Sequence, residues 1–184
     1  MNLILSIRFI KTNKKLNLMT WVISNTLFEK LREILPEGKT ILELGSGDGT
    51  SLLAKYYNMI SIEHDEKYLN LHPTKYIYAP LVEIEKQFKH FDEDTHWYNR
   101  GVLKMELPKI DYDCILVDGP PNQYGRGGFY RWFDLFKHNV PIFIDDAHRK
   151  RESKMVVLIS AKVQRPVTIY DAWKDKHWAY IPGN

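Results

Sequence analysis

Three glycines, Gly45, Gly47 and Gly49, alternate with other residues in the stretch ILELGSGDGT, directly after an apolar run. A glycine-rich turn after a buried strand lets the backbone approach a nucleotide-like ligand closely. A dinucleotide fingerprint would have its third glycine where Thr50 stands, and a phosphate-binding P-loop would end in Gly-Lys-Ser/Thr, which is absent from this stretch. Glu43 lies two residues before the first glycine, and a carboxylate there suits a ligand with a positive group better than a pyrophosphate.

A second carboxylate, Glu63, ends another apolar run 14 residues after Gly49. At the end of a strand next to the turn, a carboxylate can accept hydrogen bonds from both hydroxyl groups of a ribose. The turn could instead be no more than a tight turn. Together, the turn and the two acids favour S-adenosylmethionine, which carries a positive sulfonium, as the ligand.

Three aspartates follow two further apolar runs: Asp118 in ILVDGPP, and Asp145 and Asp146 in FIDDAHR. If both runs are strands of one parallel sheet, their carboxyl ends share an edge with the glycine turn, and the three side chains should converge. Carboxylates close together repel one another, and a divalent cation such as Mg²⁺ or Mn²⁺ removes that cost. The alternative is structural, with helix caps and a turn residue, because Asp146 is a suitable N-cap.

A metal ion held by these aspartates could bind a hydroxyl of a methyl acceptor, lower its pKa and direct it at the sulfonium methyl. We expect Asp118, His148 and Arg126 to be catalytic. His148 could take the released proton, and Arg126, in YGRGG, could hold a carboxylate or phosphate of the acceptor. A surface histidine and a solvated loop charge are the alternatives. Residues 126–154 carry seven Lys/Arg and four Asp/Glu, which favours an anionic, carbohydrate-like acceptor.

These sites need parallel strands that end at one edge of a sheet, and the apolar runs supply them. Each run is apolar almost throughout, which is typical of strands covered on both faces. Segments able to form helices separate the runs, so the order predicts a doubly wound, mostly parallel α/β sheet with right-handed crossovers. Strands are predicted at Thr40–Leu44, 59–64, 75–79, 112–118 and 140–145, and helices at 51–57, within 81–105, at 128–138 and at 147–162.

The two ends of the chain depart from this repeat. The runs 167–170 and His177–Ile181 are separated by six residues, which favours an antiparallel hairpin at one edge of the sheet. We expect a single domain over 1–184, with an N-terminal helical segment at 1–38 and a Rossmann-like core at 39–184. The helix before the first strand is predicted from apolar residues at mostly helical spacing: Trp21, Ile23, Leu27, Leu31 and Leu35.

The composition is that of a globular protein, with 44% hydrophobic residues and a net charge of +3. No Lys/Arg stripe interleaves with aromatic residues, so no nucleic-acid partner is expected. Cys114 is the only cysteine, which excludes a disulfide framework and a cysteine zinc cluster. The apolar start MNLILSIRFI contains Arg8 and is too short to span a membrane. We expect a first helix or an arm there, no membrane span, and a cytoplasmic protein.

The stretch ELGSGDG resembles the first motif of the class I S-adenosylmethionine-dependent methyltransferases, an acidic residue followed by x-Gly-x-Gly-x-Gly. The resemblance extends over roughly 41–181 and includes the C-terminal hairpin. It implies a Rossmann-like fold and S-adenosylmethionine as the cofactor. By this resemblance the methionine and sulfonium end contacts Glu43, Gly45, Ser46, Gly47 and Gly49, the ribose contacts Glu63, and further cofactor contacts are His64, Ala79, Pro80 and Asp118.

The spacing of 27 residues from Asp118 to Asp145 resembles that of catechol-type, metal-dependent O-methyltransferases. The stretches VDGPP, GRGG and DDAHR also resemble the DUF579-type polysaccharide methyltransferases, which methylate glucuronic acid side chains. Both resemblances imply transfer to oxygen of a small-molecule or saccharide acceptor. The alternatives are a small phenol or nitrogen acceptor, an aminopropyl transferase, and a nucleotide-binding module without transfer. Trp97 and Tyr98 could stack on a ligand, but core packing is the favoured interpretation.

Overall fold

The computed structural model describes residues 6–11, 23–85, 93–171 and 177–184. The strands are β1 (Ile7–Ile10), β2 (Thr40–Leu44), β3 (Asn58–Glu63), β4 (Lys75–Tyr78), β5 (Leu81–Glu83), β6 (His96–Tyr98), β7 (Cys114–Val117), β8 (Ile142–Ile144), β9 (Val167–Asp171) and β10 (His177–Ile181). The α-helices are α1 (Asn25–Ile34), α2 (Asp48–Leu53), α3 (Arg100–Glu106), α4 (Gly128–Arg131) and α5 (Lys150–Val163), and 3-10 turns lie at Glu66–Tyr68, Leu107–Lys109 and Phe133–Leu135.

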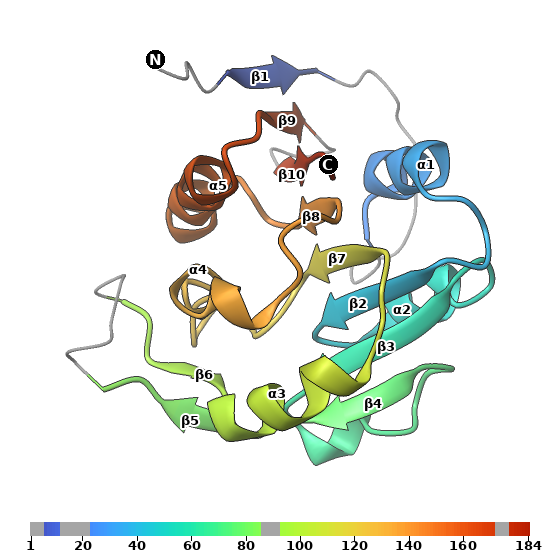
Figure 1. Cartoon of the computed structure of the whole chain (residues 1–184), viewed down its shortest axis with the longest axis vertical. Helices are drawn as coiled ribbons and strands as arrows, with labels where there is room; N and C mark the ends of the chain where they lie inside the picture. Colours follow the sequence, from blue (N-terminus) through green and yellow to red (C-terminus); the bar gives the residue numbers. More distant parts are fainter. Residues whose placement is uncertain (1–5, 12–22, 86–92, 172–176) are drawn as a thin grey trace.

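One eight-stranded sheet runs through the molecule in the order β1-β9-β10-β8-β7-β2-β3-β4 (Figure 1). Its central strands are parallel, whereas β10 is antiparallel to both β8 and β9. From β2 the chain moves outward to β3 and β4 and then returns to β7 on the other side of β2. The carboxyl ends of β2 and β7 therefore flank the switch point at which such sheets bind ligands. The predicted fold class, including the C-terminal hairpin, is confirmed.

Helices cover both faces of the sheet, and successive residues of each strand point to opposite faces. In β2, Leu42 and Leu44 pack into the larger core with side chains of α3, α4 and α5. Ile41 packs into the second core with α1 and α2. Both cores contain fully buried aromatic side chains, among them Trp97 in the first core and Trp178 in the second.

Helix α1 shows why the predicted helix before the first strand forms. The hydroxyl of Ser24 accepts a hydrogen bond from the Leu27 N–H at 3.2 Å and caps the helix. Leu27 and Leu31, four residues apart on one side, are fully buried. The helix ends before Pro36, which disfavours a helical residue ahead of it. Trp21, which belongs to the same predicted pattern, lies outside the described residues. Within the described ranges, no helix has the length and apolarity needed to cross a bilayer.

The structure differs from the prediction in three segments. Ile7–Ile10, inside the segment 1–38 expected to be helical, is a strand that pairs in parallel with β9, and all four of its residues are exposed. Because all four residues are exposed, this strand lacks the alternation of apolar and polar residues that would identify it in the sequence. Its only described partner, β9, also lies far along the chain. Region 81–105, expected to be partly helical, contains the hairpin of β5 and β6 before α3. The predicted helix at 128–138 is shorter, a single turn of α4 followed by a 3-10 turn.

Candidate cofactor and active site

The glycine-rich turn between β2 and α2 lies against the loop that follows β7. Gly45 has a φ of +87°, in the left-handed region that favours glycine. A Cβ on Gly45 would lie 3.2 Å from the Cα of Gly119, and one on Gly119 would lie 2.9 Å from the Cα of Gly45, so the close approach of two backbones explains both glycines. A Cβ on Gly47 would meet no described atom within 4 Å, which leaves space beside the turn. Gly49 instead packs against Ile23.

The side chain of Glu43, which is 2% exposed, is hydrogen-bonded to residues next to this turn. Its Oε2 accepts hydrogen bonds from the hydroxyls of Thr50 at 2.7 Å and Ser61 at 2.9 Å. The Thr50 hydroxyl in turn accepts from the Gly47 N–H at 3.0 Å. Burial raises the pKa of Glu43 to about 8, although both hydroxyls act to lower it. Glu43 therefore links β2, β3 and the turn, and its direct contact with a cofactor stays a prediction.

Glu63 faces the same turn from the end of β3. Its Oε2 accepts from the Ser46 N–H at 3.0 Å and hydroxyl at 2.7 Å, and its Oε1 accepts from the N–H groups of His64 at 2.6 Å and Asp65 at 2.9 Å. The His64 Nδ1 also lies 2.9 Å from Oε1. Burial acts to raise the pKa of Glu63, but the contacts with His64, Asp65 and Ser46 outweigh it and lower this pKa to about 2. The switch point thus holds an ionised carboxylate.

Ala79 and Pro80, two of the predicted cofactor contacts, follow β4 at the same edge. The N–H of the buried Ala79 donates to the Glu63 carbonyl at 2.8 Å, and the Pro80 carbonyl accepts from the Asn99 N–H at 2.9 Å. These bonds tie the end of β4 to β3 and to the start of α3. Contact of either residue with a ligand remains a prediction.

Asp118, Asp145 and Asp146 come together where β7 and β8 end. Each offers one carboxylate oxygen, and these oxygens lie within 4.8 Å of one another. The Asp118 side chain is 39% exposed, whereas that of Asp146 is 9% exposed. Burial and the charge of Asp145 raise the pKa of Asp118 above its usual range. The predicted convergence is therefore present in the structure, and the donor set suits a hard divalent cation.

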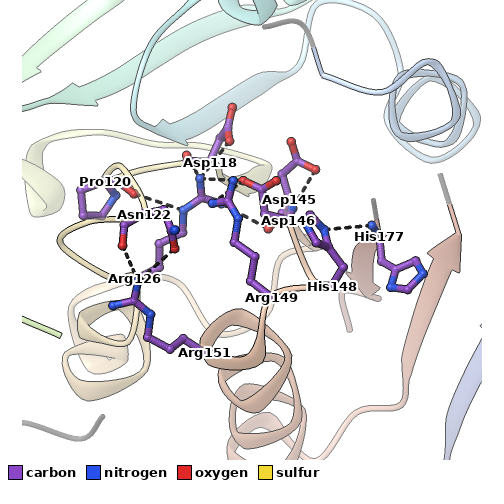
Figure 2. Close-up of polar contacts among 10 residues, drawn as sticks. All are labelled: Asp118, Pro120, Asn122, Arg126, Asp145, Asp146, His148, Arg149, Arg151 and His177. Carbon is purple, nitrogen blue, oxygen red and sulfur yellow. Dashed lines mark hydrogen bonds and ion pairs between the residues drawn. The ribbon is translucent and has the colours of Figure 1, made fainter. Parts of the chain in front are cut away.

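Arg126 lies among these carboxylates (Figure 2) and is 4% exposed. Its Nη2 lies 3.3 Å from Asp118 Oδ1 and 3.1 Å from Asp146 Oδ2, and it also donates to the Asp118 carbonyl. Its Nη1 and Nε donate to the carbonyls of Asp145 and Pro120, each at 3.2 Å. This buried guanidinium holds the loops after β7 and β8 together, and the predicted contact of Arg126 with an acceptor stays a prediction. Its charge compensates the aspartates.

Two more arginines pair within the chain. Arg149 Nη1 lies 2.8 Å from Asp146 Oδ2, which it shares with Arg126. Arg151 Nη2 donates to the Asn122 side-chain oxygen at 2.9 Å (Figure 2). The cations of 126–154 that suggested an anionic acceptor are thus partly used to bind internal acids. Sequence reasoning missed Arg149 as a partner of the cluster, although its position three residues after Asp146 allows that contact.

His148 is exposed and its ring points toward β10 (Figure 2). Its Nδ1 accepts a hydrogen bond from the His177 N–H at 3.2 Å. A neutral imidazole has one acceptor nitrogen, so Nδ1 is that acceptor and Nε2 carries the hydrogen. In this arrangement the predicted general base has no free lone pair for the proton of an acceptor. The role of His148 as a base is therefore not supported by this geometry.

Asp94 belongs to the site and was not predicted there. It is 2% exposed, and its Oδ2 accepts from the Gly127 N–H at 2.8 Å, which anchors the glycine-rich loop that carries Arg126. In the sequence the acids around it indicate only a solvated turn, because the loop it binds lies 33 residues further on. Burial raises the pKa of Asp94 to about 6, although Arg151 and the Gly127 N–H act to lower it.

The raised pKa of Asp94 predicts a pH effect on stability. Because an unfolded aspartate has a pKa of about 3.9, the contribution of Asp94 is fully present below about pH 4 and is lost as the pH rises through about 6. Asp94→Asn does not titrate, so we expect its free energy of unfolding to rise relative to wild type by up to about 3 kcal/mol between about pH 4 and pH 7. Urea denaturation at both pH values measures this shift. Exposed Asp134→Asn is the control, and a shift no larger than in that variant would contradict the expectation.

Comparisons with known proteins agree on the fold. A scan of protein-family profiles and a search of curated proteins find no match. Among solved structures, the MycE methyltransferase of the mycinamycin biosynthetic pathway, in complex with Mg, SAH and mycinamycin VI, is 15% identical with a TM-score of 0.53. The match covers 86% of this chain and 48% of MycE, so the chain spans about half the length of that relative.

Two further structures are similar over more of their own length. The METTL16 methyltransferase domain is 14% identical with a TM-score of 0.53, over 85% of this chain and 66% of the domain. A precorrin 8W decarboxylase from Methanobacterium thermoautotrophicum is 14% identical with a TM-score of 0.51, over 96% of both chains. At such identities the likeness shows a Rossmann-like methyltransferase fold, and the activity has to be argued from the site.

Proposed function

We propose that this chain, built on the methyltransferase fold, is an S-adenosylmethionine-dependent O-methyltransferase. The observation that carries the proposal is the glycine-rich turn at the switch point, flanked by the buried carboxylates of Glu43 and Glu63. The open space beside Gly47 and the ionised carboxylate of Glu63 fit a ligand with a ribose and a positive group. S-adenosylmethionine supplies an electrophilic methyl group when it is bound. Glu63, ionised at neutral pH, would accept a ribose hydroxyl in place of the Ser46 hydroxyl, and the Ser46 and Gly47 backbone would border the methionine end.

For the acceptor we propose a hydroxyl of a carbohydrate-like, possibly anionic compound. A divalent cation held by Asp118, Asp145 and Asp146 would supply the charge that lowers the pKa of that hydroxyl. Asp118, whose side chain is 39% exposed, would face the acceptor, while Arg126 keeps the cluster compact.

A metal-free methyltransferase acting on a small phenol or a nitrogen is the second candidate. One contact favours it: Asp146 Oδ2 is bound by both Arg126 and Arg149, so two arginines already compensate much of the negative charge. In that case Asp118, rather than a metal-bound group, would be the polar group nearest the acceptor.

Calorimetric titration with S-adenosylhomocysteine, with and without Mn²⁺, tests the proposal. We expect binding in the micromolar range, which corresponds to about −8 kcal/mol, and a separate Mn²⁺ event. Asp145→Asn should lose the Mn²⁺ event and methyl transfer, while its affinity for S-adenosylhomocysteine stays within about threefold of wild type. Asp134→Asn, whose side chain is 71% exposed, is the matched control.

Each outcome separates the candidates. Binding of S-adenosylhomocysteine without a metal event would favour the metal-free candidate. Binding without transfer to any hydroxyl or amine acceptor would indicate a nucleotide-binding module. No binding of S-adenosylhomocysteine would overturn the proposal.

A further inference from the structure

The hydroxyl of Tyr98 is an unpaired polar group at the switch point. Tyr98 ends β6, its side chain is fully buried, and its hydroxyl has no hydrogen-bond partner in the described part of the chain. A Cβ on Gly119 would lie 2.5 Å from this hydroxyl and 2.9 Å from the Cα of Gly45. The hydroxyl therefore borders the contact between the glycine-rich turn and the loop after β7.

The surroundings of Tyr98 keep its hydroxyl protonated. Burial raises the pKa of Tyr98 well above its usual value, and the charge of Glu63 adds to this effect while that of Arg126 opposes it. The ring also meets the His64 ring edge to face, with 6.3 Å between centroids, on the side of Glu63. A buried donor without an acceptor is unfavourable, and most such groups in native proteins have a partner.

We propose that the Tyr98 hydroxyl is a binding group for the nucleoside half of the cofactor, to which it donates a hydrogen bond. This inference rests on the proposed function. The nucleoside half is favoured because two residues that act on Tyr98 lie where a ribose is expected. The His64 ring contacts the Tyr98 ring, and the charge of Glu63 acts on the Tyr98 hydroxyl. The acceptor on the ligand would be a ribose oxygen or a ring nitrogen, both of which accept such a bond.

Tyr98→Phe removes only the hydroxyl and keeps the ring. Since the Tyr98 hydroxyl has no hydrogen bond to any described residue, the Tm without ligand should stay equal or rise. The affinities for S-adenosylhomocysteine and for adenosine should each fall about tenfold. Tyr57→Phe is the matched control, because the buried Tyr57 hydroxyl donates to the Leu35 carbonyl at 3.2 Å on the α1 face. The Tyr57→Phe variant should have a lower Tm than wild type and unchanged affinities for S-adenosylhomocysteine and adenosine.

Calorimetry with S-adenosylhomocysteine and with adenosine, together with thermal unfolding, distinguishes the outcomes. Unchanged affinities in Tyr98→Phe, with wild type binding normally, would overturn this inference alone. A loss for S-adenosylhomocysteine but not for adenosine would also overturn it, since the bond would then go to the amino-acid half. A lower Tm in the free Tyr98→Phe protein would mean that the hydroxyl has a structural partner. Absence of binding by wild type would instead overturn the proposed function, and this inference with it.

Discussion

Replacing Arg126 by methionine is expected to lower the free energy of unfolding by about 3–5 kcal/mol at about pH 8. The variant keeps much of the side-chain volume but removes the cation that lies 3.3 Å from Asp118 and 3.1 Å from Asp146. Truncating one partner of a buried ion pair leaves the other charge uncompensated, which is the costly case. We also expect loss of any transferase activity, because the loops after β7 and β8 are joined through this guanidinium.

The pH dependence identifies the charge as the cause. Without Arg126 the pKa of Asp118, which burial and the charge of Asp145 already raise, rises further above that in the unfolded chain, so stability is lost as the pH rises and the deficit should shrink near about pH 5. Arg165→Met is the control, since this 7% exposed arginine donates to the carbonyls of His138 at 2.6 Å and Val140 at 3.2 Å. Urea denaturation of both variants at the two pH values measures the deficits. Equal, pH-independent deficits would show that Arg126 contributes only its bonds to carbonyls.

The second large effect is expected for Glu63→Gln. An amide offers one oxygen, whereas the Glu63 carboxylate accepts from Ser46 on one oxygen and from the N–H groups of His64 and Asp65 on the other. In the variant, the side-chain NH2 group therefore faces at least one of these N–H groups, and two donors cannot form a hydrogen bond with each other. We expect a loss of about 3 kcal/mol of unfolding free energy near neutral pH and at least about a hundredfold loss of affinity for S-adenosylhomocysteine.

The deficit of Glu63→Gln, like that of Arg126→Met, should narrow as the pH falls, but here the cause is a loss of stability by the wild type. The pKa of Glu63 is lowered from the model-peptide range to about 2. Its contribution is therefore fully present above about pH 4.5 and is lost as the pH falls toward 2. The difference in unfolding free energy between wild type and Glu63→Gln should have its full size at about pH 6 and become smaller on acidification. Urea denaturation at several pH values measures this difference. Glu37→Gln, an exposed acid paired with Arg32, should change neither stability nor affinity. A gap that does not narrow would contradict an ionised Glu63.

The parts of the fold that local patterns determine could be predicted from the sequence. β2 begins and ends where its apolar run does, because Gly45 turns the chain there. The meeting of Asp118 with Asp145 and Asp146 follows from the shared edge of parallel strands. In contrast, β1 is recognisable only through its pairing with a strand at the far end of the chain.

The partners of charged side chains could not be predicted in the same way. Arg126 in a glycine-rich loop indicates a mobile charge, but Asp94 anchors that loop and the aspartates draw the guanidinium inward. His148 has a suitable position for a base, yet its acceptor nitrogen binds the backbone of β10. Both outcomes depend on contacts between elements that are distant in the sequence.

The position of β10 between β8 and β9 has a consequence for folding on the ribosome. Ile7 pairs with Val167, 160 residues later, and β9 joins the sheet only through β10. At about 5–20 residues per second, translation leaves β1 without its partner for on the order of ten seconds. During that time the apolar edge made by Ile7 and Phe9 is available to other nascent chains. Folding of this half of the sheet therefore waits until β9 and β10 have been synthesised.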